Sequence, residues 1–176
     1  MSGSSSSTIN NVLGEIFGTF DLSVKLRVSF NNKLVFNGCD LRPSNVINRP
    51  RVEVGGEDMR VFYTLIMVDL DAPNPSNPTL KEYLHWMVTD IPATTDPSFG
   101  HEVVDYESPH PMTGIHRIVI ALLKQQKKGT INLKPNSREN FDTQTFAQAY
   151  NLTTPAIAAY FNCQREAGSG GRRFFS

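Results

Sequence analysis

The stretch RVFYTLIMVD, residues 60–69, decides the fold class of this chain. It is rich in β-branched and aromatic residues, and apolar side chains would occupy both faces of the strand that it forms. GIHRIVIALLK (114–124) has the same character, and so has LHWMVTDI (84–91), which ends before Pro92. These three segments predict the centre of a β-sheet that is covered on both sides.

Two Asn residues mark a hairpin on the N-terminal side of this centre. Apolar and polar residues alternate over 25–30, which predicts a half-buried strand with Leu26, Val28 and Phe30 on its inner face. Asn31-Asn32 then predicts a turn into a second strand over 34–36.

The C-terminal part of the sequence predicts one helix and holds one ambiguous segment. Asp142 or Thr143 can cap a helix over 142–150. The residues on its predicted apolar face are Phe146, Ala149 and Tyr150. The segment 154–164 begins with Thr-Pro, which suits a helix N-terminus, whereas apolar residues at every second position from 157 to 163 favour a strand.

Length and composition restrict the class of protein. The 176 residues predict one domain over 11–167, with the Ser-rich residues 1–10 and the Gly-rich residues 168–176 as flexible ends. The 17 Lys and Arg residues equal the 17 Asp and Glu residues, so no direct binding to nucleic acid is expected. No apolar run is long enough to span a bilayer and the first residues are polar, which predicts a soluble protein that is not secreted. Cys39 and Cys163 lie far apart and have no metal-ligand spacing, so we expect neither a disulfide scaffold nor a structural zinc site. No sequence motif predicts a cofactor.

Four ionisable side chains lie at or near the ends of the predicted central strands: Asp69 and Asp71 in VDLDAPNP, His85 in YLHW and His116 in GIHR. If the chain stays extended through Leu70, both carboxylates lie on one side of it, and the prolines that follow leave them at a rim. The residues alone leave three interpretations open: a metal site, an acid/base pair, or a small anion pocket in which imidazoles donate hydrogen bonds. No nucleophile elbow or phosphate-binding loop is present, which disfavours a hydrolase.

Longer strings extend these motifs. The sequence contains DLDAPNPSNPTLKEYLHWMVTDIPATT (69–95), YESPHPMTGIHR (106–117), NFDTQTFAQAYNL (140–152) and YFNCQREAGSGGRR (160–173). With these strings in this order, residues 20–173 resemble the phosphatidylethanolamine-binding protein family, in its plant florigen-like branch of the flowering locus T and terminal flower type. The resemblance implies a mainly β fold, in which a large central antiparallel sheet is flanked by a smaller sheet and short helices. It also implies an anion-binding pocket at one end and a strand over 154–164.

The resemblance assigns a pocket to the four ionisable residues. Asp69, Asp71, His85 and His116 match the family's pocket motifs and would hold a phosphate or a phospholipid head group, and Tyr83 lies at the pocket mouth. Leu70 stands where the family has proline between the two aspartates. Because this exchange removes a φ constraint and adds a backbone donor, it predicts a less rigid rim.

The resemblance also implies a regulator that is not an enzyme. Relatives of this branch join a transcription complex through a 14-3-3 adaptor and a bZIP factor, which predicts a protein of the cytoplasm and nucleus that is monomeric alone. The residues that match the adaptor-contact surface are Arg60, Pro92, Phe99 and Lys128, where lysine stands in place of the usual arginine. Two other classes remain open: a phospholipid head-group carrier, and an inhibitor of a kinase or serine protease.

Two features bear on whether such a regulator promotes or opposes flowering. In the branch that the sequence resembles, a tyrosine at the position of Tyr83 is typical of relatives that promote flowering. The external loop 127–140 has Ser137 where promoters carry Trp and Glu139 where they carry Gln, so a large apolar anchor is lost and a negative charge is gained. This combination predicts an antagonist that occupies the adaptor without recruiting a coactivator.

Overall fold

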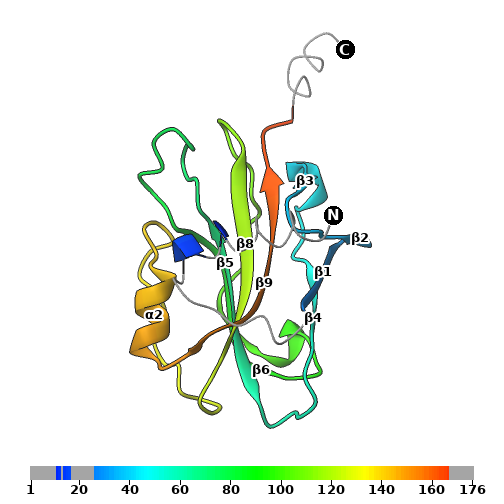
Figure 1. Cartoon of the computed structure of the whole chain (residues 1–176), viewed down its shortest axis with the longest axis vertical. Coiled ribbons are helices and arrows are strands. Elements are labelled where there is room, and N and C mark those ends of the chain that lie inside the picture. Colours follow the sequence, from blue (N-terminus) through cyan, green and yellow to red (C-terminus); the bar gives the residue numbers. More distant parts are fainter. Residues whose placement is uncertain (1–10, 13, 17–25, 167–176) are drawn as a thin grey trace.

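The computed structural model describes residues 11, 12, 14–16 and 26–166, and for residues 153–156 it describes the backbone only. The flexible ends predicted for residues 1–10 and 168–176 lie outside this part of the chain. Two sheets carry the fold (Figure 1). The larger has six strands in the order β3 (Cys39–Leu41), β9 (Thr153–Cys163), β8 (His116–Lys124), β5 (Phe62–Asp69), β6 (Tyr83–Pro92) and β7 (His101–Val104).

The predicted central strands are confirmed. Strand β5 pairs antiparallel with β6 on one side and with β8 on the other, and every β5 residue after Phe62 is buried. A strand that is apolar on both faces is stable only where both faces are covered, which is the position that β5 takes.

One edge of the larger sheet departs from the antiparallel pattern. Strand β3 pairs with β9 in parallel, with Cys39 opposite Phe161 and Leu41 opposite Cys163. Parallel neighbours need a long connection. Here most of the domain lies between the two strands, a link that no local sequence pattern could reveal.

The smaller sheet has the order β2 (Lys33–Leu34), β1 (Leu26–Phe30) and β4 (Arg51–Val54). Asn31 and Asn32 have φ values of 48° and 68°, so the predicted Asn-Asn turn is confirmed. The second strand predicted over 34–36 is too long at its end, because β2 stops at Leu34 and Phe36 turns out to solvent with 66% exposure.

Two apolar layers cover the larger sheet. On one face it packs against the smaller sheet, with Phe30, Trp86 and Phe161 among the buried residues. On the other face lie Val12, Ile16 and helix α2 (Thr143–Ala149), which Figure 1 shows on the side opposite β1 and β4. No helix within the described ranges is both long and apolar enough to cross a membrane.

Helix α2 confirms the predicted helix but differs in its buried face. The Asp142 side chain accepts a hydrogen bond from the Thr145 amide, as a helix cap does. Thr143 and Ala147 are the buried residues, whereas Ala149, expected on the inner face, is exposed. The helix is therefore rotated about its axis relative to the predicted face, with Phe146 and Tyr150 at its half-buried edge.

The ambiguous C-terminal segment is a strand. Strand β9 pairs with β8 along its length, from Lys124 opposite Thr153 to His116 opposite Cys163. The helix-start signal at Thr154-Pro155 is overridden because pairing with a buried central strand satisfies the backbone and buries the alternating apolar residues.

The described part of the chain also contains two short 3₁₀ helices, η1 (Pro43–Asn45) and η2 (Pro97–Phe99), and helical residues at 11, 12 and 14–16. Helix η2 follows the end of β6, and Asp96 is its N-cap, whose side chain accepts a hydrogen bond from the Ser98 amide. It therefore lies at the end of the sheet where β5 begins and β6 finishes.

Candidate functional site

The ends of three central strands meet at one end of the larger sheet. Strand β5 finishes at Asp69, β6 begins at Tyr83 and β8 begins at His116. They surround a cavity of about 200 Å³ whose ionisable lining residues are Asp69, Tyr83, His85, Glu107, His110 and His116. Three of the four predicted pocket residues are thus brought together, with Tyr83 beside them. No group of three or more His, Cys, Asp or Glu side chains in the described part of the chain is placed to hold a metal ion.

His116 is held on both sides of its ring. Its Nδ1 lies 2.6 Å from Oδ2 of Asp69, and its Nε2 lies 2.8 Å from the Thr113 carbonyl oxygen. Both partners accept hydrogen bonds, so both ring nitrogens donate. Burial alone would lower the pKa of His116, but the hydrogen bond and the charge of Asp69 outweigh it and raise the pKa above its usual value. This geometry favours the imidazolium form.

His85 has the opposite tendency. Its Nδ1 donates to the Glu107 carbonyl oxygen at 2.7 Å, and burial holds its pKa below the usual value. The neutral ring therefore carries its proton on Nδ1 and a lone pair on Nε2. The Tyr83 ring lies beside it, with centroids 5.1 Å apart.

Glu107 forms hydrogen bonds with both Tyr83 and His85. Its Oε2 accepts a hydrogen bond from the Tyr83 hydroxyl at 2.5 Å, while its backbone oxygen accepts from His85. Burial and this acidic neighbour raise the pKa of Tyr83 to about 12, so the hydroxyl remains a donor. Sequence reasoning missed Glu107, although it lies in the quoted string YESPHP.

Asp71 does not line the cavity, which corrects the expectation that both carboxylates lie on one side. Asp69 Oδ1 accepts a hydrogen bond from the Asp71 amide at 2.7 Å, a bend that ends the extended chain. The Asp71 carboxylate pairs instead with Arg117, whose Nη2 and Nε lie 2.9 Å from its two oxygens. His116 and Arg117 are neighbours on β8 and point to opposite faces, so their aspartate partners do the same. Burial raises the pKa of Asp71, but the hydrogen bonds from Arg117 outweigh this and lower it overall.

Leu70 uses the backbone donor that a proline would lack. Its amide donates to the Arg117 carbonyl oxygen at 3.0 Å, while the prediction of a less rigid rim stays a prediction. Its side chain is 2% exposed and packs in the core layer with Val12 and Ile16. The Leu70 amide is therefore hydrogen-bonded. This bond extends the pairing of the β5 and β8 segments one residue beyond Asp69.

The rim of the cavity is formed by two loops in close contact. Gly114 has a φ of +76°, and a Cβ atom there would lie 2.6 Å from Cδ of Pro75. Only glycine combines this backbone conformation with this approach. The loop before β8 is thereby fixed against the loop that follows β5.

The residues predicted to contact an adaptor lie at the other end of β5. Phe62 pairs with Pro92 across the sheet, and Lys128 Nζ lies 5.8 Å from the centre of the Phe62 ring. Arg60 precedes this strand, and its guanidinium forms a two-point contact with the Asp58 carboxylate, with both N–O distances at 3.0 Å. Phe99, in η2 next to β6, is 66% exposed. Since β5 has eight residues, this surface is about 23 Å from the Asp69 cavity.

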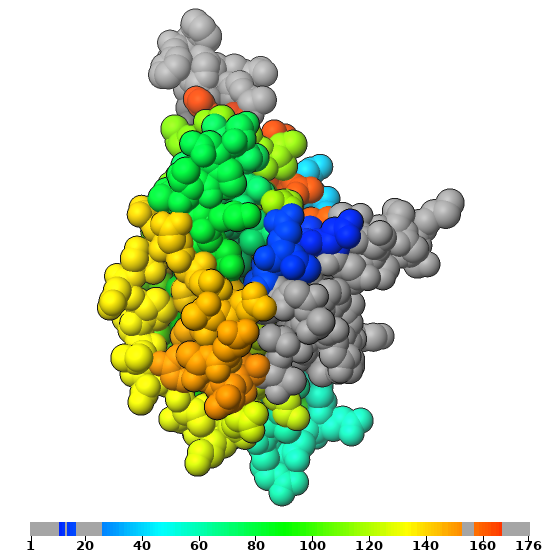
Figure 2. Space-filling view, turned by 60° about the vertical axis from the view of Figure 1, so that its left-hand side comes forward, coloured from blue at the N-terminus to red at the C-terminus, as the bar shows by residue number. Residues whose placement is uncertain are grey.

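The external loop contacts both the pocket and helix α2. Arg138, which sequence reasoning did not single out, donates to the backbone oxygens of Leu84 and His85 at 3.1 and 3.0 Å. Ser137 and Glu139 line a cavity of about 440 Å³ together with Phe146 and Tyr150 of the α2 region. Figure 2 shows the loop (yellow) and α2 (orange) side by side on one face.

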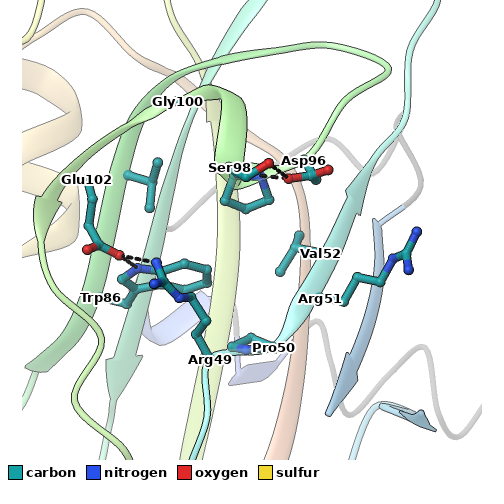
Figure 3. A pocket seen from close by; sticks show the side chains of 11 residues that line it. Arg49, Pro50, Arg51, Val52, Trp86, Asp96, Ser98, Gly100 and Glu102 are labelled. Atoms are coloured by element: carbon teal, nitrogen blue, oxygen red, sulfur yellow. Dashed lines mark hydrogen bonds and ion pairs between the residues drawn. The ribbon is translucent and has the colours of Figure 1, made fainter. Parts of the chain in front are cut away.

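A larger cavity of about 630 Å³ lies between β4 and the β6–η2–β7 edge (Figure 3). Its polar groups bind one another: Glu102 Oε2 accepts from Trp86 Nε1 at 2.8 Å and from Arg49 Nη1 at 2.9 Å. Ser98 donates to Asp96, and the Arg51 guanidinium points away from these groups. The smaller Asp69 cavity is the stronger candidate for a ligand site, since it brings Asp69, His85, Glu107 and His116 together at the ends of three central strands.

Comparisons with known proteins agree with this architecture. Residues 28–162 match the family model described as phosphatidylethanolamine-binding protein. The chain is 54% identical to Protein FLOWERING LOCUS T and 48% identical to Protein TERMINAL FLOWER 1, both from Arabidopsis thaliana. These alignments cover 94% of each chain in the first case and 93% in the second.

Solved structures show the same fold at low sequence identity. A carboxypeptidase Y inhibitor, solved in complex with its cognate proteinase, matches with a TM-score of 0.80 and 19% identity over 94% of this chain and 96% of the inhibitor. The phosphatidylethanolamine-binding protein from Plasmodium vivax matches with a TM-score of 0.76 and 20% identity, over 90% and 95% of the two chains.

Proposed function

The chain belongs to the phosphatidylethanolamine-binding protein family, in the plant branch of FLOWERING LOCUS T and TERMINAL FLOWER 1, and we propose that it regulates flowering time or meristem fate. The proposal rests on the sequence identity of about one half to these two proteins, which extends over nearly the whole chain. It describes a non-enzymatic protein that acts by binding partners in the cytoplasm and nucleus.

The partner that we propose is a 14-3-3 adaptor carrying a bZIP transcription factor. The observation that carries this proposal is the gathering of Arg60, Pro92, Phe99 and Lys128 at one end of the larger sheet. They come from four separate segments of the sequence, so their joint position is a property of the fold. We call these four residues the adaptor surface.

The chemistry of the adaptor surface suits a protein partner. Phe99 offers an exposed aromatic ring, the kind of anchor that interfaces favour. Asp58 holds the Arg60 guanidinium in one orientation, which lowers the entropy lost when a partner binds it. Lys128 supplies a second positive charge next to Phe62.

Calorimetry with a purified 14-3-3 protein tests this proposal. Arg60→Glu should weaken binding about ten-fold or more, since it reverses a charge at the interface. Arg27→Glu is the matched control, because Arg27 is also exposed and also contacts a carboxylate, 3.4 Å away, but lies in the smaller sheet. Equal weakening by both variants, or no binding by the unmodified protein, would refute the adaptor surface.

The sign of action that we propose is antagonism. Glu139 places a carboxylate beside the apolar side chains of Phe146 and Tyr150 in the cavity between the external loop and α2. A coactivator that needs an apolar anchor would bind this surface poorly. Overexpression in a plant should therefore delay flowering, and exchange of residues 127–140 for a promoter-type loop should reverse the effect. Early flowering caused by the unmodified protein would refute antagonism, whereas the proposal that the chain binds a 14-3-3 adaptor would be unaffected.

A further inference from the structure

We propose that Gln125 is a positioning residue of the adaptor surface, and that its buried side-chain amide fixes where Pro92, Phe99 and Lys128 lie. This inference rests on the proposed binding of a 14-3-3 adaptor. Gln125 itself is only 3% exposed, so it acts through its neighbours and not by touching the partner. Burial of a side-chain amide costs free energy unless its hydrogen bonds are made, so the contacts of this residue show what it holds in place.

The Gln125 side chain uses its full capacity for hydrogen bonds. Its Oε1 accepts from the Thr64 hydroxyl and from the Asp90 backbone amide, both at 2.8 Å. Its Nε2 donates to Oδ1 of Asp90 at 2.8 Å and to the Lys127 carbonyl oxygen at 3.1 Å. A side-chain amide has two donors and two lone pairs, and all four are engaged. One residue after the end of β8 therefore joins β5, β6 and the start of the external loop.

The first element that Gln125 holds is a β-bulge in β6. The register of the β5–β6 pair shifts between residues 63 and 65, which leaves β6 with one extra residue at this point. Asp90 lies in the bulge and has a φ of 58°, a conformation that residues other than glycine rarely adopt. Gln125 binds both the backbone amide and the carboxylate of Asp90 and so stabilises this conformation. Pro92 follows two residues later, and its position depends on the bulge.

The same bulge supports the helix that carries Phe99. Gly100 follows Phe99, and a Cβ atom on Gly100 would lie 2.6 Å from the Thr89 carbonyl oxygen. The end of η2 therefore packs directly on the backbone of the bulge, with no space for a side chain between them. A change in the bulge should move the exposed Phe99 ring as well.

The loop that carries Lys128 is held on both sides of this residue. On one side, the Lys127 carbonyl oxygen accepts from Gln125. On the other side, the Gly129 amide donates to Oδ1 of Asp90 at 2.9 Å, the same oxygen that Gln125 binds. Three of the four residues of the adaptor surface therefore depend on one buried amide. Such a preformed arrangement lowers the entropy lost when a partner binds.

Variants of similar size separate hydrogen bonding from packing. Gln125→Met keeps the length of the side chain but removes its four hydrogen bonds. Gln125→Glu keeps Oε1 and turns a second acceptor toward Asp90 Oδ1 and the Lys127 carbonyl oxygen, where a donor is needed. Gln126→Met is the matched control, because Gln126 is the next residue, is exposed, and binds the Asn151 carbonyl oxygen at 3.2 Å.

Calorimetry with a purified 14-3-3 protein, well below the unfolding temperature of every variant, tests the inference. Gln125→Met and Gln125→Glu should each weaken binding about ten-fold, and Gln126→Met should bind like the unmodified protein. The NMR amide signals of Asp90, Lys128 and Gly129 should also shift in the two Gln125 variants. A role in stability alone would lower the unfolding temperature and leave the affinity of the folded variants unchanged, which would overturn the inference.

Asp90 offers a second series in case the Gln125 variants do not fold, because its side chain is only half-buried. Asp90→Asn keeps an oxygen for the donors of Gln125 and Gly129 and should bind the adaptor nearly like the unmodified protein. Asp90→Ala removes this oxygen and should weaken binding about ten-fold. An equal loss in both Asp90 variants would show that the charge matters and not the hydrogen bonds, and would contradict the inference.

The two proposals fail in distinguishable ways. If the unmodified protein binds, Arg60→Glu weakens binding and the folded Gln125 and Asp90 variants bind normally, the adaptor surface stands and only the role of Gln125 is refuted. If the unmodified protein does not bind a 14-3-3 protein, the adaptor surface is refuted and the positioning role falls with it.

Discussion

The His116 imidazole and the Asp69 carboxylate form a buried pair, 2.6 Å apart, with side chains that are 3% and 7% exposed. The pair links the start of β8 to the end of β5, so the two central strands are joined by side chains where their backbone ladder ends. Both ring nitrogens of His116 are thereby engaged within the protein, one with Asp69 and one with the Thr113 carbonyl oxygen.

Asp69→Asn should lower the pKa of His116 and destabilise the fold by about 3 kcal/mol, as the loss of one partner of a buried pair does. A folded-state pKa that is raised contributes stability below the unfolded value near 6.5 and loses it as pH rises through the folded value. The difference in unfolding free energy between Asp69→Asn and the unmodified protein should therefore shrink above pH 6.5. Urea unfolding at several pH values measures it, and a constant difference would contradict the imidazolium form.

His85 should produce the opposite pH dependence. Burial lowers its pKa, so its contribution to stability is lost as pH falls from about 6.5 through the folded-state value. His85→Gln should reduce the loss of unfolding free energy between pH 7 and pH 5. Identical acid profiles for unmodified protein and His85→Gln would contradict the burial of a neutral ring.

Glu82 should destabilise the protein as pH rises. Burial raises its pKa from 4.5 to about 7, against the opposing hydrogen bonds from Thr143. The native state therefore binds more protons than the unfolded state between these pH values, and stability falls as pH rises through them. Glu82→Gln should remove this dependence and add up to about 3 kcal/mol at pH 8. Thermal unfolding at pH 5 and pH 8 measures the effect, and an equal change at both pH values would argue against it.

Gly114 and Gly129 have nearly the same φ, so substituting each by alanine distinguishes the cost of backbone strain from the cost of a steric contact. Their φ values are +76° and +77°, but an added Cβ would contact Pro75 at Gly114 and nothing within 4 Å at Gly129. Alanine at either position should cost about 1 kcal/mol or more for the backbone conformation. Gly114→Ala should cost more and should also shift the NMR signals of the cavity residues. If Gly129→Ala shifts them equally, the contact with Pro75 does not position the rim.

Lys128→Arg should strengthen adaptor binding by about 0.5–1.5 kcal/mol, because a guanidinium makes planar two-point contacts that an ammonium cannot. Calorimetry with a 14-3-3 protein measures the change. Equal or weaker binding by Lys128→Arg would mean that this position does not contact the adaptor.

The sequence pattern predicted the strands that are buried on both faces, because such strands are continuous runs of apolar residues. Strands β5, β6 and β8 follow directly from their apolar runs. The strand β9 could not be assigned from its own sequence, since its pairing with β8 overrides a local helix signal.

The site was predictable in its residue types and less so in its contacts. Asp71 was expected in the pocket because alternation was extrapolated past Asp69, whereas its position is decided by Arg117, 46 residues away in the sequence. Glu107 and Arg138 were missed because a loop carboxylate and a loop guanidinium have no periodic signature. Their partners become visible only when the strands are assembled.

The most direct test of the account compares two phenylalanines that are equally exposed. Phe99 in the adaptor surface and Phe36 after β2 are both 66% exposed, so truncation of either removes similar apolar area from the free protein. In calorimetry with a 14-3-3 protein, we expect Phe99→Ala to weaken binding by about 2 kcal/mol, as an interface anchor does, and Phe36→Ala to bind like the unmodified protein. Unchanged affinity for Phe99→Ala, or an equal loss for Phe36→Ala, would contradict an adaptor surface at this end of the sheet.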